Sequence, residues 1–347
     1  RNSIYFNLDT PQIKLLVTLG PSSLNEKTVR QCAEHDIYLF RINLSHTPLE
    51  TVEDTIKKIR NWTDVPICLD SEGAQLRNQN MKGGVVTFAT GAEVRIAYEP
   101  IEGDENNISF TPLDCTRQFQ IGDQIRIDFG GAMIKVMAVH GDHCMAEVIR
   151  GGPVGSNKAA DTDRELDLIP ITEKDAGAIE IGRRMGIRNF ALSFANSADD
   201  VKQMRELCGS EACLISKIES RQGLANLQKI VEETDEILID RGDLSRQVPL
   251  EKIPFLQRRI ISVAKAKKTP VFVATNLLET MIHTHLPTRA ELNDVVSTLL
   301  MGADGAVLAA ETAIGKYPVE AVNMIRILAD EVNKWTPYST IEEILNS

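Results

Sequence analysis

Short apolar runs alternate with helical patterns along most of the chain. Eight runs have the length and composition of buried strands, and the segments between them carry apolar residues at helical spacing. The helical segments include residues 25–35, 48–60, 198–207, 251–266 and 318–335. The strand-like runs are residues 13–20, 38–44, 65–70, 189–194, 213–219, 236–240, 270–275 and 305–311. Eight strands that alternate with helices can close a barrel, so we predict an α/β protein built on a (β/α)8 TIM barrel.

One long interruption separates the third and fourth runs. From about residue 80 the chain alternates or runs apolar between Gly and Asp turns, notably over residues 85–90, 93–99, 124–131, 134–140 and 144–152. This pattern predicts a small antiparallel β-domain inserted after the third barrel strand. We therefore place the first part of the barrel at 1–78, the inserted β-rich lid at 79–163 and the second part of the barrel at 164–347.

Composition narrows the class of protein. The 347 residues include 43% apolar and 25% charged side chains, which is typical of a globular protein. The 38 basic and 49 acidic residues give a net charge of −11, which argues against nonspecific nucleic-acid binding and against binding to an anionic membrane. No apolar run approaches ~20 residues and no signal-peptide pattern opens the sequence, so we expect a cytoplasmic protein outside the membrane. The six cysteines lack C-x-x-C spacing and are expected to be reduced, buried thiols.

Polar residues gather where the predicted strands end. In a (β/α)8 barrel the carboxyl ends of the strands meet at one mouth, which is where the chemistry of such enzymes takes place. Unpaired charges are costly at such a place, so these groups must pair, hydrate or bind an ion. We therefore expect a functional site among the residues at these ends: Arg41, Asn43, Ser45, Asp70, Ser193, Lys217, Glu219, Asp240, Asp243, Thr275 and Glu311.

Several of these residues have more than one interpretation. Lys217 and Glu219 lie on one face of a strand and could form a simple ion pair. Alternatively, Glu219 and Asp243 could hold a divalent cation, since Mg²⁺ is commonly bound by carboxylates that water and substrate oxygens supplement. The segment RGDLS, residues 241–245, is either an ordinary turn or an anion site in which Gly242 admits a ligand close to the backbone.

Longer motifs point to one family. They are ordered along the sequence and include VTLGPSS (17–23), FRINLSH (40–46), LISKIES (214–220), ILIDRGDLS (237–245), VFVATNLLETMI (271–282) and ADGAVLAAETAIGKYPVEAV (303–322). Over nearly its whole length the sequence resembles the pyruvate kinase family. The resemblance implies a glycolytic transferase that converts phosphoenolpyruvate and ADP to pyruvate and ATP.

The resemblance also implies roles for the residues at the barrel mouth. Lys217 matches the lysine that stabilises the transferring phosphoryl group and the enolate, Arg41 would contact the phosphate, and Thr275 lies beside the carbon that is protonated. Glu219 and Asp243 match the ligands of Mg²⁺ or Mn²⁺. The backbone amides of Gly242 and Asp243 would hold the substrate carboxylate, and Ser193 joins this substrate-binding set.

Two further sets follow from the same motifs. A monovalent-cation site for K⁺ is implied at Asn43, Ser45, Asp70 and Ser71. Binding of ADP or ATP is implied at His46 and Arg77 and, from the lid, at Lys158. We expect only small-molecule partners, a phosphoenolpyruvate- or pyruvate-like acid and a nucleotide, and self-association into a homo-oligomer stays open.

The sequence departs from the family pattern at positions close to these residues. Glu72 replaces a lysine, Gln75 replaces the acid associated with K⁺ dependence, Asp240 replaces an alanine, and Asn196 replaces an arginine, while Ala309 and Ala310 stand in place of Ser-Gly. We expect the family's C-terminal domain to be absent. Two alternatives therefore stay open: an enzyme that uses another phosphoryl acceptor or performs decarboxylation or aldol-type chemistry on a 2-oxo acid, and a non-catalytic relative.

Overall fold

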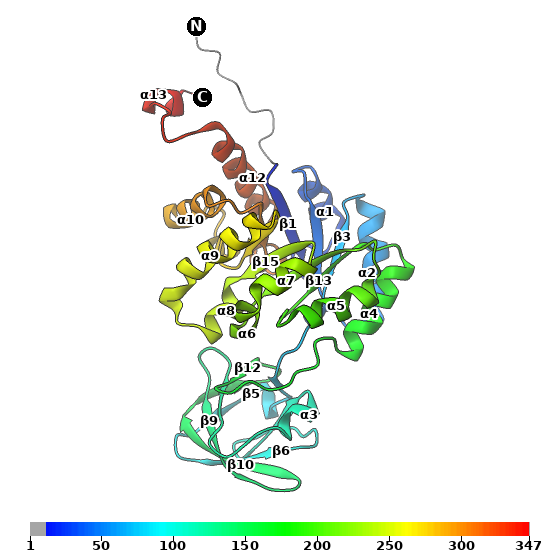
Figure 1. The fold of residues 1–347 in the computed structure, drawn as a ribbon, viewed down its shortest axis with the longest axis vertical. Helices are drawn as coiled ribbons and strands as arrows, with labels where there is room; N and C mark the ends of the chain where they lie inside the picture. Colours follow the sequence, from blue (N-terminus) through cyan, green and yellow to red (C-terminus); the bar gives the residue numbers. More distant parts are fainter. Residues whose placement is uncertain (1–11, 347) are drawn as a thin grey trace. The chain divides into compact units, whose positions relative to one another are not determined.

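The computed structural model describes residues 12–346, which form two compact units. The first unit comprises the described residues up to Glu72 together with those from Ile171 onward, and the second comprises Gly73–Pro170. The first unit is the barrel and the second is the β-rich insertion (Figure 1). Each unit has its own apolar core.

The barrel is closed by eight parallel strands, which confirms the predicted (β/α)8 architecture. Each of the eight predicted runs forms one strand, and the order around the barrel is β1-β17-β16-β15-β14-β13-β3-β2. The strands are β1 Lys14–Leu19, β2 Leu39–Asn43, β3 Ile67–Asp70, β13 Asn189–Leu192, β14 Cys213–Ile218, β15 Glu236–Asp240, β16 Val271–Ala274 and β17 Gly305–Leu308.

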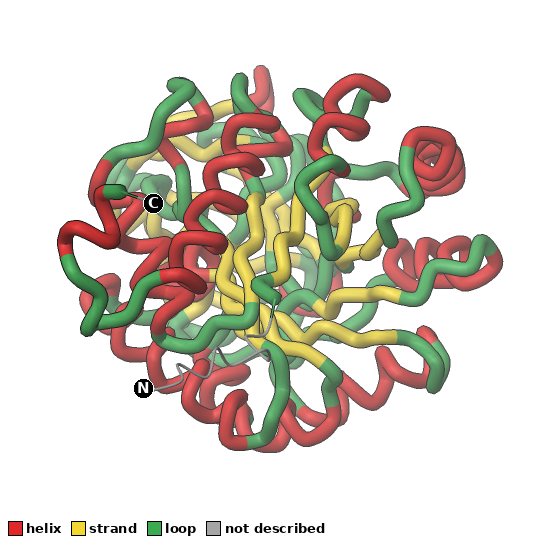
Figure 2. Tube along the Cα trace, turned by 90° about the horizontal axis from the view of Figure 1, so that it is seen from above, coloured by secondary structure: helices red, strands yellow, loops and turns green. Residues whose placement is uncertain are grey.

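Helices surround the barrel strands, as Figure 2 shows from above. The longer ones are α1 Glu26–Ala33, α2 Leu49–Trp62, α4 Glu173–Arg184, α5 Ala198–Cys208, α7 Leu227–Glu233, α9 Ile253–Ala266, α10 Arg289–Leu300 and α12 Pro318–Lys334. Shorter ones are α6 Arg221–Ala225, α8 Arg241–Gln247, α11 Ala310–Ala313 and α13 Ile341–Leu345. The five helices named from sequence all form, and Asn25 caps α1 through its side chain as its residue type predicts.

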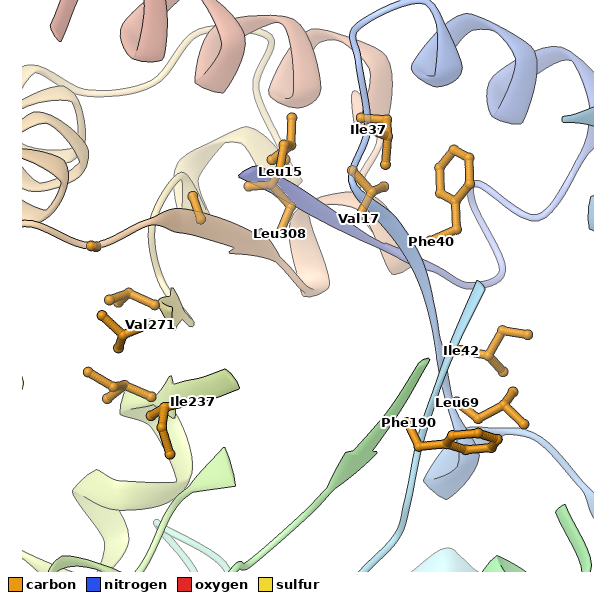
Figure 3. Close-up of a cluster of buried hydrophobic side chains, with 14 of the residues drawn as sticks. Leu15, Val17, Ile37, Phe40, Ile42, Leu69, Phe190, Ile237, Val271 and Leu308 are labelled. Carbon is orange, nitrogen blue, oxygen red and sulfur yellow. The ribbon is translucent and has the colours of Figure 1, made fainter. Parts of the chain in front are cut away.

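Alternation along the strands creates two apolar layers. Side chains such as Leu15, Phe40 and Phe190 lie between the strands and the helices (Figure 3). The intervening positions face the barrel interior and form a second cluster: Leu16, Leu39, Cys68, Ala191, Ile215, Leu238, Phe272, Ala274 and Val307. The next inward-facing residue along five of these strands is polar. These residues are Thr18, Arg41, Asp70, Lys217 and Asp240. The strand period therefore carries these five residues to the barrel mouth.

The second unit is a mixed β-structure, which corrects the prediction of a purely antiparallel domain. A seven-stranded sheet has the order β12-β8-β9-β10-β6-β7-β4, and β11 pairs with β5. Strands β6 and β7 run parallel, joined by a long connection that the alternation pattern did not reveal. The strands are β4 Arg77–Asn78, β5 Val85–Phe88, β6 Glu93–Ala97, β7 Asn107–Thr111, β8 Gln124–Ile127, β9 Met133–Val139, β10 His143–Arg150, β11 Gly152–Gly155 and β12 Ala160–Thr162, with α3 Leu113–Thr116.

The second unit is wider than the expected range of 79–163. Strand β4 pairs with β7 of this unit, and Leu76 is buried in its core. At the other end Leu166 and Leu168 pack against the same core. The connecting segments thus belong to the insertion because their apolar side chains have their partners there.

Two expectations from composition can be compared with the described residues. All six cysteines are free, and five of them are buried as predicted, whereas Cys213 is half-buried. Burial raises the pKa of the Cys32 thiol to about 12, which leaves it protonated and unreactive at neutral pH. No helix in residues 12–346 is long and apolar enough to span a bilayer.

Candidate active site

Lys217 lies at the centre of the barrel mouth, on β14. Its ammonium Nζ is 3.1 Å from Asp70 Oδ2, 3.1 Å from Ser193 Oγ and 3.1 Å from Glu219 Oε1. The side chain is 5% exposed, so these contacts replace water. Residues from the ends of β3, β13 and β14 are therefore brought together around one buried cation.

Asp70 lies between two cations. Its Oδ2 accepts a hydrogen bond from Arg41 Nε, and its Oδ1 accepts one from Ser193 Oγ at 3.0 Å, while Lys217 contacts both oxygens. Arg41 is anchored in turn by donation from Nη1 to Thr18 Oγ1 at 2.6 Å. Sequence reasoning missed Thr18, although its inward position on β1, two residues after Leu16, was the signal that could have found it. The two cations are thus held in fixed places by β1 and β3.

Mutual attraction keeps Lys217, Arg41 and Asp70 ionised. Burial alone lowers the pKa of Lys217, but the carboxylates of Asp70 and Glu219 outweigh it, and the pKa lies above the ordinary lysine value. Burial raises the pKa of Asp70, yet Lys217 and Arg41 reverse this effect and hold it below the usual carboxyl value. Lys217, Arg41 and Asp70 therefore stay charged at neutral pH.

A cluster of three carboxylates lies on the other side of Lys217. Glu219, Asp240 and Asp243 each offer an oxygen, and these oxygens lie within 4.8 Å of one another. Glu219 is fully buried, and its Oε2 accepts a hydrogen bond from the Phe194 amide at 2.7 Å. Its Oε1 accepts no hydrogen bond from the described residues, although Lys217 Nζ lies 3.1 Å away as an ion-pair partner.

This crowding of like charges has a clear effect on Glu219. Burial, followed by Asp243 and Asp240, raises the pKa of Glu219 well above its ordinary value against the opposing effect of Lys217. Three carboxylate oxygens with one of them lacking a donor match the ligand preference of a hard divalent cation such as Mg²⁺ or Mn²⁺. The residues present therefore fit the metal that their positions predict.

Asp240 also caps the N-terminus of α8. Its Oδ1 accepts hydrogen bonds from the Gly242 amide at 3.0 Å, the Asp243 amide at 3.2 Å and Thr275 Oγ1 at 2.8 Å. The two amides predicted to hold a substrate carboxylate thus contact a carboxylate of the chain itself. A Cβ on Gly242 would lie 2.8 Å from Thr275 Cγ2, which explains why this position has no side chain.

The backbone at the mouth is strained. Thr275 has φ of 80°, in the left-handed region that a β-branched residue rarely adopts, and Phe194 at 52° and Asn276 at 60° lie in the same region. Arg241 holds the first of these in place by donating to the Thr275 carbonyl at 3.1 and 2.6 Å, and it also pairs with Asp294. Such strain is typical of binding and catalytic sites, where the surrounding structure maintains it.

The predicted monovalent-cation residues lie at the ends of β2 and β3. The side chain of Asn43 accepts from the Ser45 amide at 3.0 Å, and Ser71 Oγ accepts from the Ser193 amide at 3.0 Å. Asp70 already contacts Arg41 and Lys217, so a K⁺ ion would share it with two cations. The monovalent site stays a prediction.

The predicted nucleotide residues fall in both units. His46 is exposed in the 3-10 turn Leu44–His46 of the barrel. Arg77 and Lys158 belong to the second unit, where Arg77 donates to the Asn157 carbonyl at 2.9 Å and the Lys158 amide donates to Asn78 at 2.8 Å. The structure therefore brings Arg77 and Lys158 together on neighbouring segments of the insertion.

Two departures from the family pattern have local partners. Glu72 forms an ion pair with Lys174 at 3.0 Å, and its amide donates to the buried Asp175. Asn196 accepts a hydrogen bond from Ser220 Oγ and connects the loops after β13 and β14. Both residues are thus engaged in the loops around the mouth.

A closed (β/α)8 barrel whose mouth holds two buried cations beside a carboxylate cluster defines a barrel enzyme suited to a strongly anionic substrate. The comparisons with known proteins name the family. The model of the pyruvate kinase barrel domain matches residues 10–322. Pyruvate kinase of Mycobacterium tuberculosis is 34% identical over 325 residues, which cover 91% of this chain and 69% of that protein. Pyruvate kinase of Thermococcus litoralis is 32% identical over 352 residues, 98% of this chain and 74% of that protein. The chain belongs to the pyruvate kinase family.

Proposed function

We propose that this chain transfers the phosphoryl group of phosphoenolpyruvate to ADP and releases pyruvate and ATP. The observation that carries the proposal is the pair of buried cations, Lys217 and Arg41, held around Asp70 at the mouth of a pyruvate kinase barrel. Phosphoryl transfer depends on positioning and charge neutralisation more than on covalent help, and fixed cations supply both.

These positions support the roles that we propose. The bond between phosphorus and the enol oxygen breaks, and a bond to a terminal oxygen of ADP forms. Arg41 orients the phosphoryl group, and Lys217 stabilises the charge that passes through it and remains on the enolate oxygen. The enolate then takes a proton at carbon, for which we assign the side of the site near Thr275. The proton reaches the carbon through water.

We assign the divalent cation, Mg²⁺ or Mn²⁺, to Glu219 and Asp243. When bound, it neutralises charge on the phosphoryl oxygens. The fit rests on the cluster in which Glu219 has an oxygen without a hydrogen-bond donor. We assign K⁺ to Asn43, Ser45, Asp70 and Ser71.

Substrate contacts complete the proposal. The amides of Gly242 and Asp243, with Ser193, are assigned to the carboxylate end of phosphoenolpyruvate, and Asp240 must give up its hydrogen bonds when a carboxylate binds there. His46, Arg77 and Lys158 are assigned to the nucleotide. We propose a cytoplasmic location, which cell fractionation would test, and light scattering would show whether the chain forms a homo-oligomer.

A coupled assay tests the activity. Purified protein is incubated with phosphoenolpyruvate, ADP and Mg²⁺ or Mn²⁺, with and without K⁺, and pyruvate is followed through lactate dehydrogenase. The expected result is pyruvate formation that needs both substrates and the metal and that is lost in Lys217→Met. A matched control is Lys57→Met, which removes an exposed lysine of α2 and should leave the rate unchanged. Equal rates for the wild type and Lys217→Met would refute the assignment.

One observation favours a second candidate. Asp240 accepts hydrogen bonds from both amides that are expected to bind the substrate carboxylate. This favours a site for a different acid, used in decarboxylation, in aldol-type chemistry or in transfer to another phosphoryl acceptor. Metal-dependent exchange of the pyruvate methyl protons with solvent, seen by NMR without ADP, combined with no ATP formation would favour this candidate. Absence of both exchange and transfer would leave a non-catalytic relative.

A further inference from the structure

Asp240 divides its carboxylate between two sides of the mouth. Oδ1 accepts three hydrogen bonds, from the amides of Gly242 and Asp243 and from Thr275 Oγ1. Oδ2 accepts no hydrogen bond from any residue in 12–346. The first oxygen therefore fixes the orientation of the side chain, and the second is left available as a ligand.

The neighbours of Asp240 supply the rest of a coordination site. Its carboxylate lies in the cluster with Glu219 and Asp243, whose oxygens are within 4.8 Å of one another. Asp243 pairs with Arg246 at 3.0 Å through Oδ1, and Glu219 lies near Lys217, so cations approach the cluster from its edges. These two neighbouring cations do not satisfy every oxygen.

A separate observation points to a ligand that belongs in this cluster. Glu219 has 0% exposure, and its Oε1 accepts no hydrogen bond from the described residues. Lys217 Nζ lies 3.1 Å away and is shared with Asp70, so a buried oxygen without a hydrogen bond keeps a desolvation cost that a metal ion would offset. The geometry of the cluster and the unsatisfied oxygen of Glu219 therefore indicate the same occupant.

We propose that Asp240 is a third protein ligand of the divalent cation, beside Glu219 and Asp243. The proposal rests on the proposed function, in which Glu219 and Asp243 are the other two ligands. Hard cations bind more tightly as the number of charged oxygen ligands rises. A site with two carboxylates depends on water and substrate oxygens for the rest, whereas the third carboxylate here belongs to the chain.

The test measures Mn²⁺ binding to the full chain without phosphoenolpyruvate or nucleotide, by the EPR signal of free Mn²⁺. Asp240→Asn is the informative variant, because its amide oxygen can still accept the hydrogen bonds at the start of α8 while the charge is removed. We expect binding to weaken by about tenfold or more, the effect typical of perturbing a metal site. Asp304→Asn is the matched control, since Asp304 also caps a backbone amide, that of Val271 at 2.9 Å, but precedes β17 at the opposite end of the barrel.

The outcomes separate this proposal from the proposed function. If Asp240→Asn binds Mn²⁺ within twofold of the wild type while Glu219→Gln abolishes binding, the third-ligand proposal is overturned and the Glu219–Asp243 pair stands. If neither variant changes Mn²⁺ binding, the metal assignment in the proposed function fails as well.

A second measurement does not depend on the folding of a variant. Crystals of the wild type are soaked in MnCl₂ alone, and anomalous diffraction locates the ion. The proposal predicts an oxygen of Asp240 at about 2.0–2.6 Å from the metal, the range for hard cations and oxygen ligands. A metal bound by Glu219 and Asp243 with both oxygens of Asp240 beyond bonding distance would contradict it.

Discussion

Asp70→Asn is the most informative single substitution, because Asp70 holds both functional cations. The change keeps the size of the side chain and removes the charge between Arg41 and Lys217. Asp70 is 0% exposed, so no water replaces the lost charge. Removing one partner of a buried ion pair costs about 3–5 kcal/mol, and we expect the lower end because asparagine can still accept a hydrogen bond.

That loss can be expressed as a melting temperature and a rate. For a unit of about 250 residues, each kcal/mol corresponds to roughly 2–4 °C, so we expect Tm to fall by about 6–12 °C. Lys217 and Arg41 lose their common anchor, and kcat should fall about 100-fold or more, as when an oriented catalytic donor is lost. Because the pKa of Asp70 is held below its ordinary value of 3.8, its stabilisation is complete above that pH and is lost as the pH falls further.

Glu53→Gln provides the matched control. Glu53 also contacts two cations, Lys57 at 2.7 Å and Arg184 at 2.6 Å, but its side chain is 40% exposed. Exposed ion pairs contribute little to stability because solvent screens them, so the loss of this one should lower Tm by at most a few degrees. Urea and thermal unfolding followed by circular dichroism, with kcat from the coupled assay, compare the two variants. If Asp70→Asn loses no more stability and no more activity than Glu53→Gln, the account of the buried cation pair is refuted.

Two further substitutions test the carboxylate cluster and the turn into α8. In metal-free protein, Glu219→Gln should raise the free energy of unfolding at pH 7, because the raised pKa of Glu219 makes its ionisation unfavourable in the folded state. This gain in stability should shrink as the pH falls to 4.5. Urea titrations in EDTA at both pH values would measure it, and a difference that stays constant between them would contradict the prediction. Gly242→Ala should lower kcat/KM by about 10–100-fold, because the added Cβ would displace Thr275. Gly141→Ala is the control and should have no effect, since Gly141 has open space around it. Equal kinetics for the two variants would refute the packing argument.

Much of the barrel could be predicted because it depends on a simple period. Inward and outward positions alternate along every strand, so eight apolar runs separated by helices leave few other ways to bury them. The same alternation located Lys217, Glu219 and Asp70 at the mouth. What the period does not encode is pairing between distant segments, and for that reason the parallel β6–β7 pair and the short strand β4 were not foreseen.

The limits of prediction at the site have a similar cause. The sequence marked Asp240 as an added charge, but its contact with Thr275 depends on the approach of β15 and β16 and on a positive φ at Thr275. Its hydrogen bonds to the amides of Gly242 and Asp243 follow a local rule, since aspartate is a favoured N-cap residue, and that signal was available in the sequence. The partner of Arg41 on β1, Thr18, depends on the register of two strands.

The proposed phosphoryl transfer is tested most directly by ³¹P NMR of the wild-type protein mixed with phosphoenolpyruvate, ADP and MgCl₂. The account predicts that the phosphoenolpyruvate resonance is replaced, one for one, by the γ-phosphate resonance of ATP, and that Lys217→Met leaves the spectrum unchanged over the same time. A wild-type spectrum in which phosphoenolpyruvate persists, or in which its phosphorus appears as inorganic phosphate without ATP, would contradict it.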